Sequence, residues 1–389
     1  MANNNNKKQK ISGLVLAAFI FAVSLAQIAY IQSTFLNQFF NLELVSVVFF
    51  IAYLASFIVM NEYPNIIAKF NNLNTALAVF IVQILTLLIF IFLQINIFIF
   101  LAFIFYVICI NILFINFDIF LEAYTKDAQT GRIRGIYYTI YNLGWVISPF
   151  ISGNILDNFG FNVLFGFVII LILPILYILK IQFKNYKNHY QRKHFKVIKT
   201  IKTVIKHPNL ERIFYLAFLL QIFYGIMVIY TPIYLNQYIG LSWSQIGIIF
   251  SIMLLPFVLI EYPAGYLADK YWGEKELLTI GIVITSLAAL GVFIFESHSM
   301  IFWAALLFFS RVGASLIEIM RDTYFFKKVD AQDIELINAF RSTTPLAYIF
   351  VPLLGAAVLY FFPINYIFLF LCGILLTGLY FSLKLKDTK

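Results

Sequence analysis

The stretch from 261 to 275 reads EYPAGYLADKYWGEK and separates two long apolar runs. It combines two helix-breaking residues, Pro263 and Gly265, with charges such as Asp269 and Lys275. Proline lacks a backbone N–H and glycine has no preferred helical conformation, so together they favour a turn. Charges at the end of an apolar run mark a boundary with water. The stretch therefore predicts a polar turn between two membrane-spanning helices.

The overall composition supports a membrane protein. Of 389 residues, 62% are hydrophobic and 12% are charged, and the mean hydropathy is +0.91. A soluble domain of this length has about 25% charged residues. Cys109 and Cys372 lie inside apolar runs, and the histidines show no metal-ligand spacing, so we expect no disulfide, metal or cofactor. No phosphate-binding loop or nucleophile elbow is present, so neither an ATP-driven pump nor an enzyme is expected.

Apolar stretches near the ~20 residues that a bilayer requires predict the helical fold. We expect an all-α polytopic protein with twelve transmembrane helices, six in each half. They fall near 11–33, 43–61, 75–94, 97–123, 134–155, 162–182, 210–234, 243–261, 277–296, 299–325, 336–361 and 364–384. The first apolar run is longer than that of a signal peptide, so it is expected to be an uncleaved span.

The basic residues test this count, because twelve spans place alternate loops on opposite sides. The N-tail, the mid-chain segment, the loops after spans two, four, eight and ten, and the C-terminus contain Lys or Arg. The loops at 34–42, 156–161, 235–242, 297–298 and 362–363 contain none. By the positive-inside rule both termini are cytoplasmic. We expect a multi-pass protein of a prokaryotic inner (plasma) membrane.

These boundaries predict a cytosolic N-tail (1–10), an N-terminal six-helix bundle (11–182), a basic cytosolic linker (183–208) and a C-terminal six-helix bundle (209–389). The linker charge is expected to fix topology and contact anionic lipid headgroups. Its part from 195 to 205 is an alternative candidate for a basic helix lying on the membrane. No nucleic-acid binding is expected.

The two halves also resemble each other in sequence. Leu36-Asn-Gln recurs as Leu235-Asn-Gln, and Glu62-Tyr-Pro recurs as Glu261-Tyr-Pro, both at an offset of 199. Such a parallel repeat of six spans is typical of transporters in which a central site opens alternately to each side.

The turn sequence G-Y-L-A-D-K-Y-W-G-E-K (265–275) resembles the loop signature of the major facilitator superfamily, G-x-L-A-D-R-x-G-R-K. The resemblance implies two six-helix bundles related by a pseudo-twofold axis, a secondary transporter working as a monomer, and a cytoplasmic gate at this loop. The gate candidates are Glu261, Gly265, Asp269, Lys270, Gly273 and Lys275. Our hypothesis is that Asp269 caps the N-terminal end of span five near Arg134 when the site faces outward.

Span five contains a second motif, G-W-V-I-S-P-F-I-S-G (144–153). With Gly144, Ser148, Pro149 and Gly153 it is similar to the G-x-x-x-G-P-x-x-G-G motif of the superfamily's antiporters, with serine at two glycine positions. Small residues also allow close packing of helices whatever the function.

Ionisable residues inside spans are costly and are candidates for function. Spans four and ten each carry a polar stripe on one helical face: Asn111, Asp118 and Glu122 in the first, Arg311, Ser315 and Glu318 in the second. In the superfamily's fold, spans one, four, seven and ten line the central cavity, which adds Gln27, Gln221 and Tyr224 as candidates.

Arg311 is expected to anchor an anionic group or to partner a coupling carboxylate. The alternative is a structural ion pair with Asp118 or Glu318. These two carboxylates are candidates for proton coupling, because a buried carboxylate released from an arginine binds a proton more readily. Glu122 is close enough to Lys126 that a surface ion pair is the alternative. The glutamines and Tyr224 have packing between helices as their alternative.

The sequence favours a secondary active transporter of a small solute, working by alternating access and coupled to H⁺. Efflux of an amphipathic or drug-like compound is favoured by the span-five motif and the aromatic helices. The alternatives are uptake or exchange of an anionic solute anchored by Arg311, and a membrane sensor or scaffold without turnover.

Overall fold

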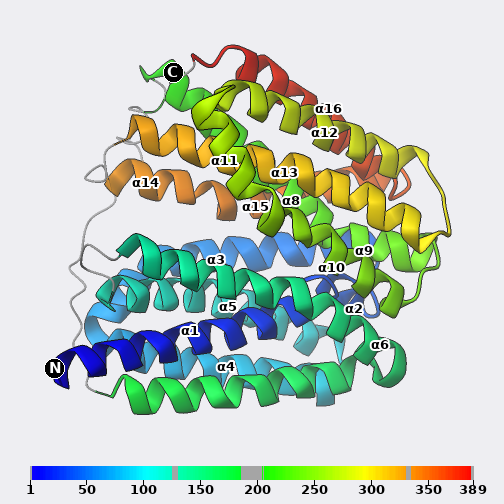
Figure 1. Ribbon diagram of the computed structural model, residues 1–389. Coiled ribbons are helices and arrows are strands. Elements are labelled where there is room, and N and C mark those ends of the chain that lie inside the picture. Colours follow the sequence, from blue (N-terminus) through cyan, green and yellow to red (C-terminus); the bar gives the residue numbers. More distant parts are fainter. Residues whose placement is uncertain (1, 125–129, 185–203, 205, 330–333, 387–389) are drawn as a thin grey trace. The chain divides into compact units, whose positions relative to one another are not determined.

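The computed structural model describes residues 2–124, 130–184, 204, 206–329 and 334–386, with the backbone alone at some helical positions. Every regular element in these residues is helical (Figure 1). The chain divides into two compact units. Unit 1 contains Met1–Asn41 and Ile51–Lys193, and unit 2 contains Leu42–Phe50 and His194–Lys389.

The helices of the first half are α1 (Ala2–Ala29), α2 (Gln32–Leu36), α3 (Leu42–Phe70), α4 (Asn72–Phe92), α5 (Asn96–Tyr124) and α6 (Thr130–Gln182). Those of the second half are α8 (Pro208–Ile229), α9 (Thr231–Ile233), the π-helical turn η1 (Tyr234–Tyr238), α10 (Trp243–Leu259), α11 (Glu261–Lys270), α12 (Glu274–Ile294), α13 (Met300–Lys328), α14 (Ile334–Arg341), α15 (Thr343–Phe361) and α16 (Tyr366–Leu383). The first nine residues of α3 group with unit 2, where the Ser46 and Tyr230 hydroxyl oxygens lie 2.8 Å apart.

Eleven helical runs in the described residues are long and apolar enough to cross a bilayer. The run at 139–182 is 44 residues long, twice what a bilayer of about 30 Å requires. It contains Gly160, whose φ of 76° interrupts the helix. The run therefore accounts for the two spans predicted at 134–155 and 162–182.

Contacts with α1 confirm that α6 reverses direction at Gly160. Before the glycine, Gly144 packs against Ala22 near the end of α1. After it, Phe165 meets Phe35 just beyond α1, while Gln182 reaches back to Gly13. The second segment is therefore antiparallel to α1, as Figure 1 shows.

One expectation about a helix end was wrong. The stretch predicted as a turn from 261 to 275 is helical as far as Lys270, and the real turn is short, with Gly273 at φ 115°. Pro263 is accommodated because it lies in the first turn of α11, where backbone N–H groups have no intrahelical partner. Helix α1 begins at Ala2, ahead of the apolar run that starts at Gln9, so the predicted N-tail (1–10) continues into the first span as helix, and its place in the cytosol stays a prediction.

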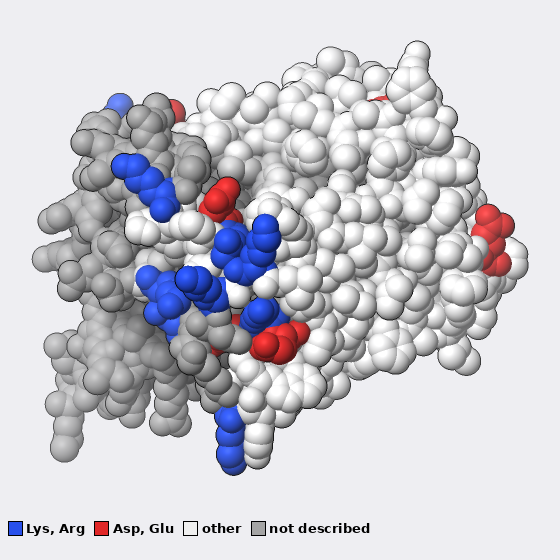
Figure 2. Space-filling view, turned by 90° about the horizontal axis from the view of Figure 1, so that it is seen from above, with Lys and Arg blue, Asp and Glu red and all other residues white. Residues whose placement is uncertain are grey.

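The linker falls almost entirely outside the described residues, and so does the helix considered for 195–205. Lys and Arg side chains of the described part gather at one end of the face shown in Figure 2, and an acidic group lies at the opposite end.

Candidate functional site

Two helices of unit 2, α8 and α13, carry the polar groups of the candidate site. Glycines fix both helices against their neighbours. A Cβ on Gly313 of α13 would lie 2.6 Å from the carbonyl oxygen of Gly281 on α12. A Cβ on Gly225 of α8 would lie 3.0 Å from Val351 Cγ2 on α15. Such close approach fixes α13 against α12 and α8 against α15.

Arg311 is the buried cation of the site. Its side chain lies on α13 and the residue is 1% exposed. The guanidinium carbon is 4.9 Å from the ring centre of Phe223 and 5.5 Å from that of Tyr224, both on α8. Its Nη1 atom has no hydrogen-bond partner in the described part of the chain.

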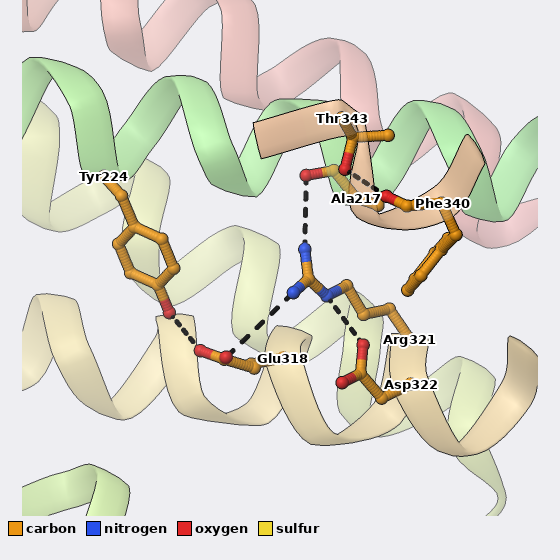
Figure 3. A network of polar contacts seen from close by, with 7 residues as sticks. All are labelled: Ala217, Tyr224, Glu318, Arg321, Asp322, Phe340 and Thr343. Carbon is orange, nitrogen blue, oxygen red and sulfur yellow. Dashed lines mark hydrogen bonds and ion pairs between the residues drawn. The ribbon is translucent and has the colours of Figure 1, made fainter. Parts of the chain in front are cut away.

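Glu318 lies two turns further along α13, and α8 supplies its closest donor. The Tyr224 hydroxyl donates to Glu318 Oε2 at 2.5 Å (Figure 3). Arg321 Nη2 is 4.0 Å from Glu318 Oε1, at the limit of an ion pair. The Glu318 side chain is 34% exposed, so its carboxylate is not enclosed by the protein. The ion pair between Arg311 and Glu318 that the sequence left open is not formed.

Arg321 donates its hydrogen bonds to acceptors other than Glu318. Its Nε donates to Asp322 Oδ1 at 3.0 Å, and its Nη1 donates to the carbonyl oxygen of Ala217 on α8 at 3.3 Å. Its guanidinium lies 5.6 Å from the ring centre of Phe340 on α14 (Figure 3). Arg321 therefore joins α8, α13 and α14, and its charge is balanced first by Asp322.

Phe223 and Arg321 belong to the site but were not predicted from the sequence. Arg321 could have been found as a second arginine in an apolar run, one turn from Glu318. Phe223 has no such signal, because 45 phenylalanines make one more aromatic uninformative.

The candidates of unit 1 are placed differently. Gln27 of α1 is fully buried, and neither its amide nitrogen nor its oxygen has a partner among the described residues. Asn111 donates to the Val107 carbonyl of its own helix at 2.9 Å. Asp118 is exposed on α5, and the side chain of Glu122 lies outside the described residues. On α8 of unit 2, Gln221 is buried.

Unit 1 also contains a buried polar network that was not predicted from the sequence. Tyr63 of α3 donates through its hydroxyl to Asn116 Oδ1 on α5 at 2.7 Å. Asn72 Nδ2, at the start of α4, donates to the Asn116 carbonyl oxygen at 3.2 Å. Asn116 lies between two predicted candidates, and nothing in the spacing distinguished it from a packing residue. The network joins three helices and carries no charge.

The chain matches a known family over nearly its whole length. The family described as the Major Facilitator Superfamily matches residues 11–252 and 234–389. The chain belongs to the Major Facilitator Superfamily.

Solved structures of major facilitator transporters agree in fold. A bacterial homologue of the iron transporter ferroportin, in an inward-facing state, has a TM-score of 0.77 at 12% identity, covering 97% of this chain and 98% of the other. An auto-inhibited POT family peptide transporter gives 0.78 at 12%, covering 98% of each chain. The nucleoside transporter NupG gives 0.74 at 14%, covering 97% and 98%. At these identities the likeness shows the fold alone. A search of curated proteins found no match.

The superfamily's loop signature falls partly on described side chains. Gly265 has open space where a Cβ would be, Lys270 is exposed, and Lys275 is half-buried. The side chains of Glu261, Asp269 and Arg134 lie outside the described residues, so the proposed cap on span five stays a prediction. Next to Gly273, Glu274 is buried and accepts from Lys327 Nζ on α13 at 2.6 Å.

The antiporter-like motif packs α6 against α1. A Cβ on Gly144 would lie 2.9 Å from Ala22 Cβ. Ser148 Oγ lies 2.6 Å from the Gly144 carbonyl oxygen and 3.2 Å from that of Val23. Pro149 and Gly153 are buried in the same helix. The motif therefore allows close packing of α6 against α1. This role does not depend on which substrate is transported.

Proposed function

We propose that this major facilitator transporter moves a small amphipathic organic anion by alternating access, with Arg311 binding the anion and Glu318 binding the coupling proton. The observation that carries the proposal is the buried guanidinium of Arg311, whose Nη1 has no acceptor in the described residues.

Arg311 needs an anion on energetic grounds. Removing an isolated charge from water costs several kcal/mol in a protein interior. The rings of Phe223 and Tyr224 offset about 0.5–2 kcal/mol through cation–π attraction. A carboxylate or phosphonate at Nη1 would form a charge-assisted hydrogen bond and balance the charge. We therefore assign to the substrate an anionic group that reaches Nη1.

The surroundings of Arg311 favour an apolar body on the substrate. Phe223 and Tyr224 stand beside the guanidinium, and Phe257 of α10 meets Tyr224 edge-on with ring centres 6.1 Å apart. Aromatic faces contribute affinity through buried area without fixing the orientation of the ligand. The proposed substrate therefore combines the two substrate classes considered from the sequence, an amphipathic compound and an anion held by Arg311.

The sequence favours efflux of a drug-like compound on two grounds, the span-five motif and the aromatic helices. Gly144 and Ser148 make helix-packing contacts, so the span-five motif does not favour one substrate class. The buried charge of Arg311 favours an anion.

We also propose a multi-pass monomer of the plasma membrane with both termini in the cytoplasm. The gathering of Lys and Arg at one end of the face in Figure 2 supports this orientation.

Transport by reconstituted protein tests the proposal. Vesicles containing the wild type are expected to accumulate labelled benzoate when a proton gradient is imposed, and vesicles containing Arg311→Met are expected to show only passive leak. Arg212→Met is the matched control, because Arg212 lies at the start of α8 and bonds to Asn209 and the Lys384 carbonyl, away from the site.

The same experiment separates the alternatives. Binding of benzoate without flux above leak would favour a sensor or scaffold. Equal flux in the wild type and Arg311→Met would contradict the assignment of Arg311.

A further inference from the structure

We infer that Tyr224 couples anion binding at Arg311 to proton uptake at Glu318, so that one organic monoanion and one proton cross together without net charge. The inference rests on the proposed anion site and adds the residue that links it to the proton.

Tyr224 is in contact with both groups. Its ring centre is 5.5 Å from the Arg311 guanidinium carbon, and its hydroxyl donates to Glu318 Oε2 at 2.5 Å. The ring is rigid, so a displacement of its face also moves its hydroxyl. The backbone beneath it is fixed, because the next residue, Gly225, packs directly against Val351.

The coupling follows from the two contacts. An anion bound at Nη1 balances the charge of Arg311 and weakens the attraction between guanidinium and ring. The Tyr224 ring is then free to turn, and its hydroxyl leaves the Glu318 carboxylate. Having lost its nearest donor, the carboxylate takes a proton from a hydronium ion. A new O–H bond forms on the carboxylate as one O–H bond of the hydronium breaks, and water is left. The bound anion and this proton sum to zero charge.

The other charged groups near Glu318 do not replace Tyr224. On α13, Arg321 is closer to Asp322 (3.0 Å) than to Glu318 (4.0 Å). From α14, Arg341 acts on Asp322. Of the other helices packed on α13, α10 has no ionisable side chain. On α11, Lys270 is exposed, and the side chains of Glu261 and Asp269 lie outside the described residues.

Helix α12 has its charges in its first turn. There Glu274 pairs with Lys327, nine residues or about 14 Å along α13 from Glu318. Among the described residues, Tyr224 is the one that contacts both the buried cation Arg311 and the Glu318 carboxylate.

The first test measures proton uptake by purified protein when benzoate is added in weakly buffered solution containing a pH dye. The wild type is expected to take up about one proton per bound benzoate, by reciprocal linkage. Tyr224→Phe keeps the ring on Arg311 and removes the hydroxyl, so it is expected to bind benzoate and lose the proton uptake. Glu318→Gln is expected to lose it as well.

Tyr215→Phe is the matched control. Tyr215 lies on the same helix and shares a 2.7 Å hydrogen bond with Thr377 on α16, so its variant is expected to behave as the wild type. Proton uptake by Tyr224→Phe equal to that of the wild type would overturn the inference.

A second test needs no anion. The infrared difference spectrum on acidification is expected to contain a carboxyl band that Glu318→Gln lacks. This band is expected at a different frequency in Tyr224→Phe, because the hydrogen-bond partner is gone, and unchanged in Tyr215→Phe. An identical band in Tyr224→Phe and the wild type would overturn the inference even if benzoate binds. A shifted band without benzoate binding would instead count against the proposed function.

Discussion

The guanidinium carbon of Arg311 lies 4.9 Å from the ring centre of Phe223, and in the described residues the Nη1 atom of this buried cation has no hydrogen-bond partner. Membrane-embedded arginines usually pair with an acid or with backbone carbonyls. The acid nearest in sequence, Glu318, is held instead by Tyr224. The contact therefore leaves the charge of Arg311 available to a ligand.

Without a ligand, Arg311 is expected to destabilise the protein. Arg311→Met keeps a long side chain between the aromatic rings and removes the buried charge. Replacing buried charges by apolar groups is often neutral or stabilising. In thermal unfolding without added anion, Arg311→Met is expected to melt at or above the temperature of the wild type, and Arg212→Met is not expected to rise. A large loss of stability in Arg311→Met would mean that the guanidinium has a structural acceptor.

Where α12 crosses α13, Gly281 and Gly313 are in such close contact that neither position is expected to accept a side chain. A Cβ on Gly281 would lie 2.7 Å from the Gly313 carbonyl oxygen, a backbone atom that cannot turn aside. Gly281→Ala or Gly313→Ala should therefore lower the free energy of unfolding by about 1–3 kcal/mol. Gly373→Ala on α16 meets open space and should cause no loss. Equal denaturation midpoints for all three variants would show that the helices are farther apart.

The hydrogen bond from Tyr63 to Asn116 is expected to stabilise unit 1. Tyr63→Phe leaves the buried Asn116 Oδ1 without its 2.7 Å donor, at a cost of about 1–3 kcal/mol. Tyr360→Phe, at a residue that is 75% exposed, is the control and should be neutral. Chemical denaturation in detergent measures both, and equal midpoints would mean that another donor satisfies Asn116.

Lys327 is expected to matter more than its neighbour Lys328. Both lysines are exposed at the end of α13, but Lys327 donates to Glu274, which is 1% exposed. Lys327→Met removes a partner from a buried carboxylate and should cost about 1–3 kcal/mol. Lys328→Met should cost little. Comparable unfolding temperatures for the two variants would contradict a stabilising role of the ion pair between Lys327 and the start of α12.

Most of the fold could be predicted from the lengths of the apolar runs. They place the spans, and the reversal at Gly160 falls between two spans predicted as separate helices. The stretch after Glu261 was mistaken for a turn, because a proline in the first turn of a helix has the same local sequence as a proline that ends one. Only the following Gly273, with its positive φ, distinguishes the two.

The site could be predicted in part. Helical spacing placed Arg311 and Glu318 on one face of α13, because that relation lies within a single helix. Their partners could not be predicted in the same way. Phe223 and the Ala217 carbonyl that accepts from Arg321 belong to α8, and which face of α8 meets α13 depends on packing between segments that are far apart in sequence.

Anion binding by Arg311 is tested most directly by the thermal stability of purified protein titrated with benzoate, hexanoate, phenylphosphonate and the neutral control benzamide. A ligand at 100 times its Kd stabilises the folded protein by about 2.7 kcal/mol. We predict that at least one of the anions stabilises the wild type and Arg212→Met, that benzamide stabilises neither, and that Arg311→Met responds to none of the anions. Equal stabilisation of the wild type and Arg311→Met, or no response of the wild type to any of the anions, would contradict the assignment of Arg311 as the anion-binding residue.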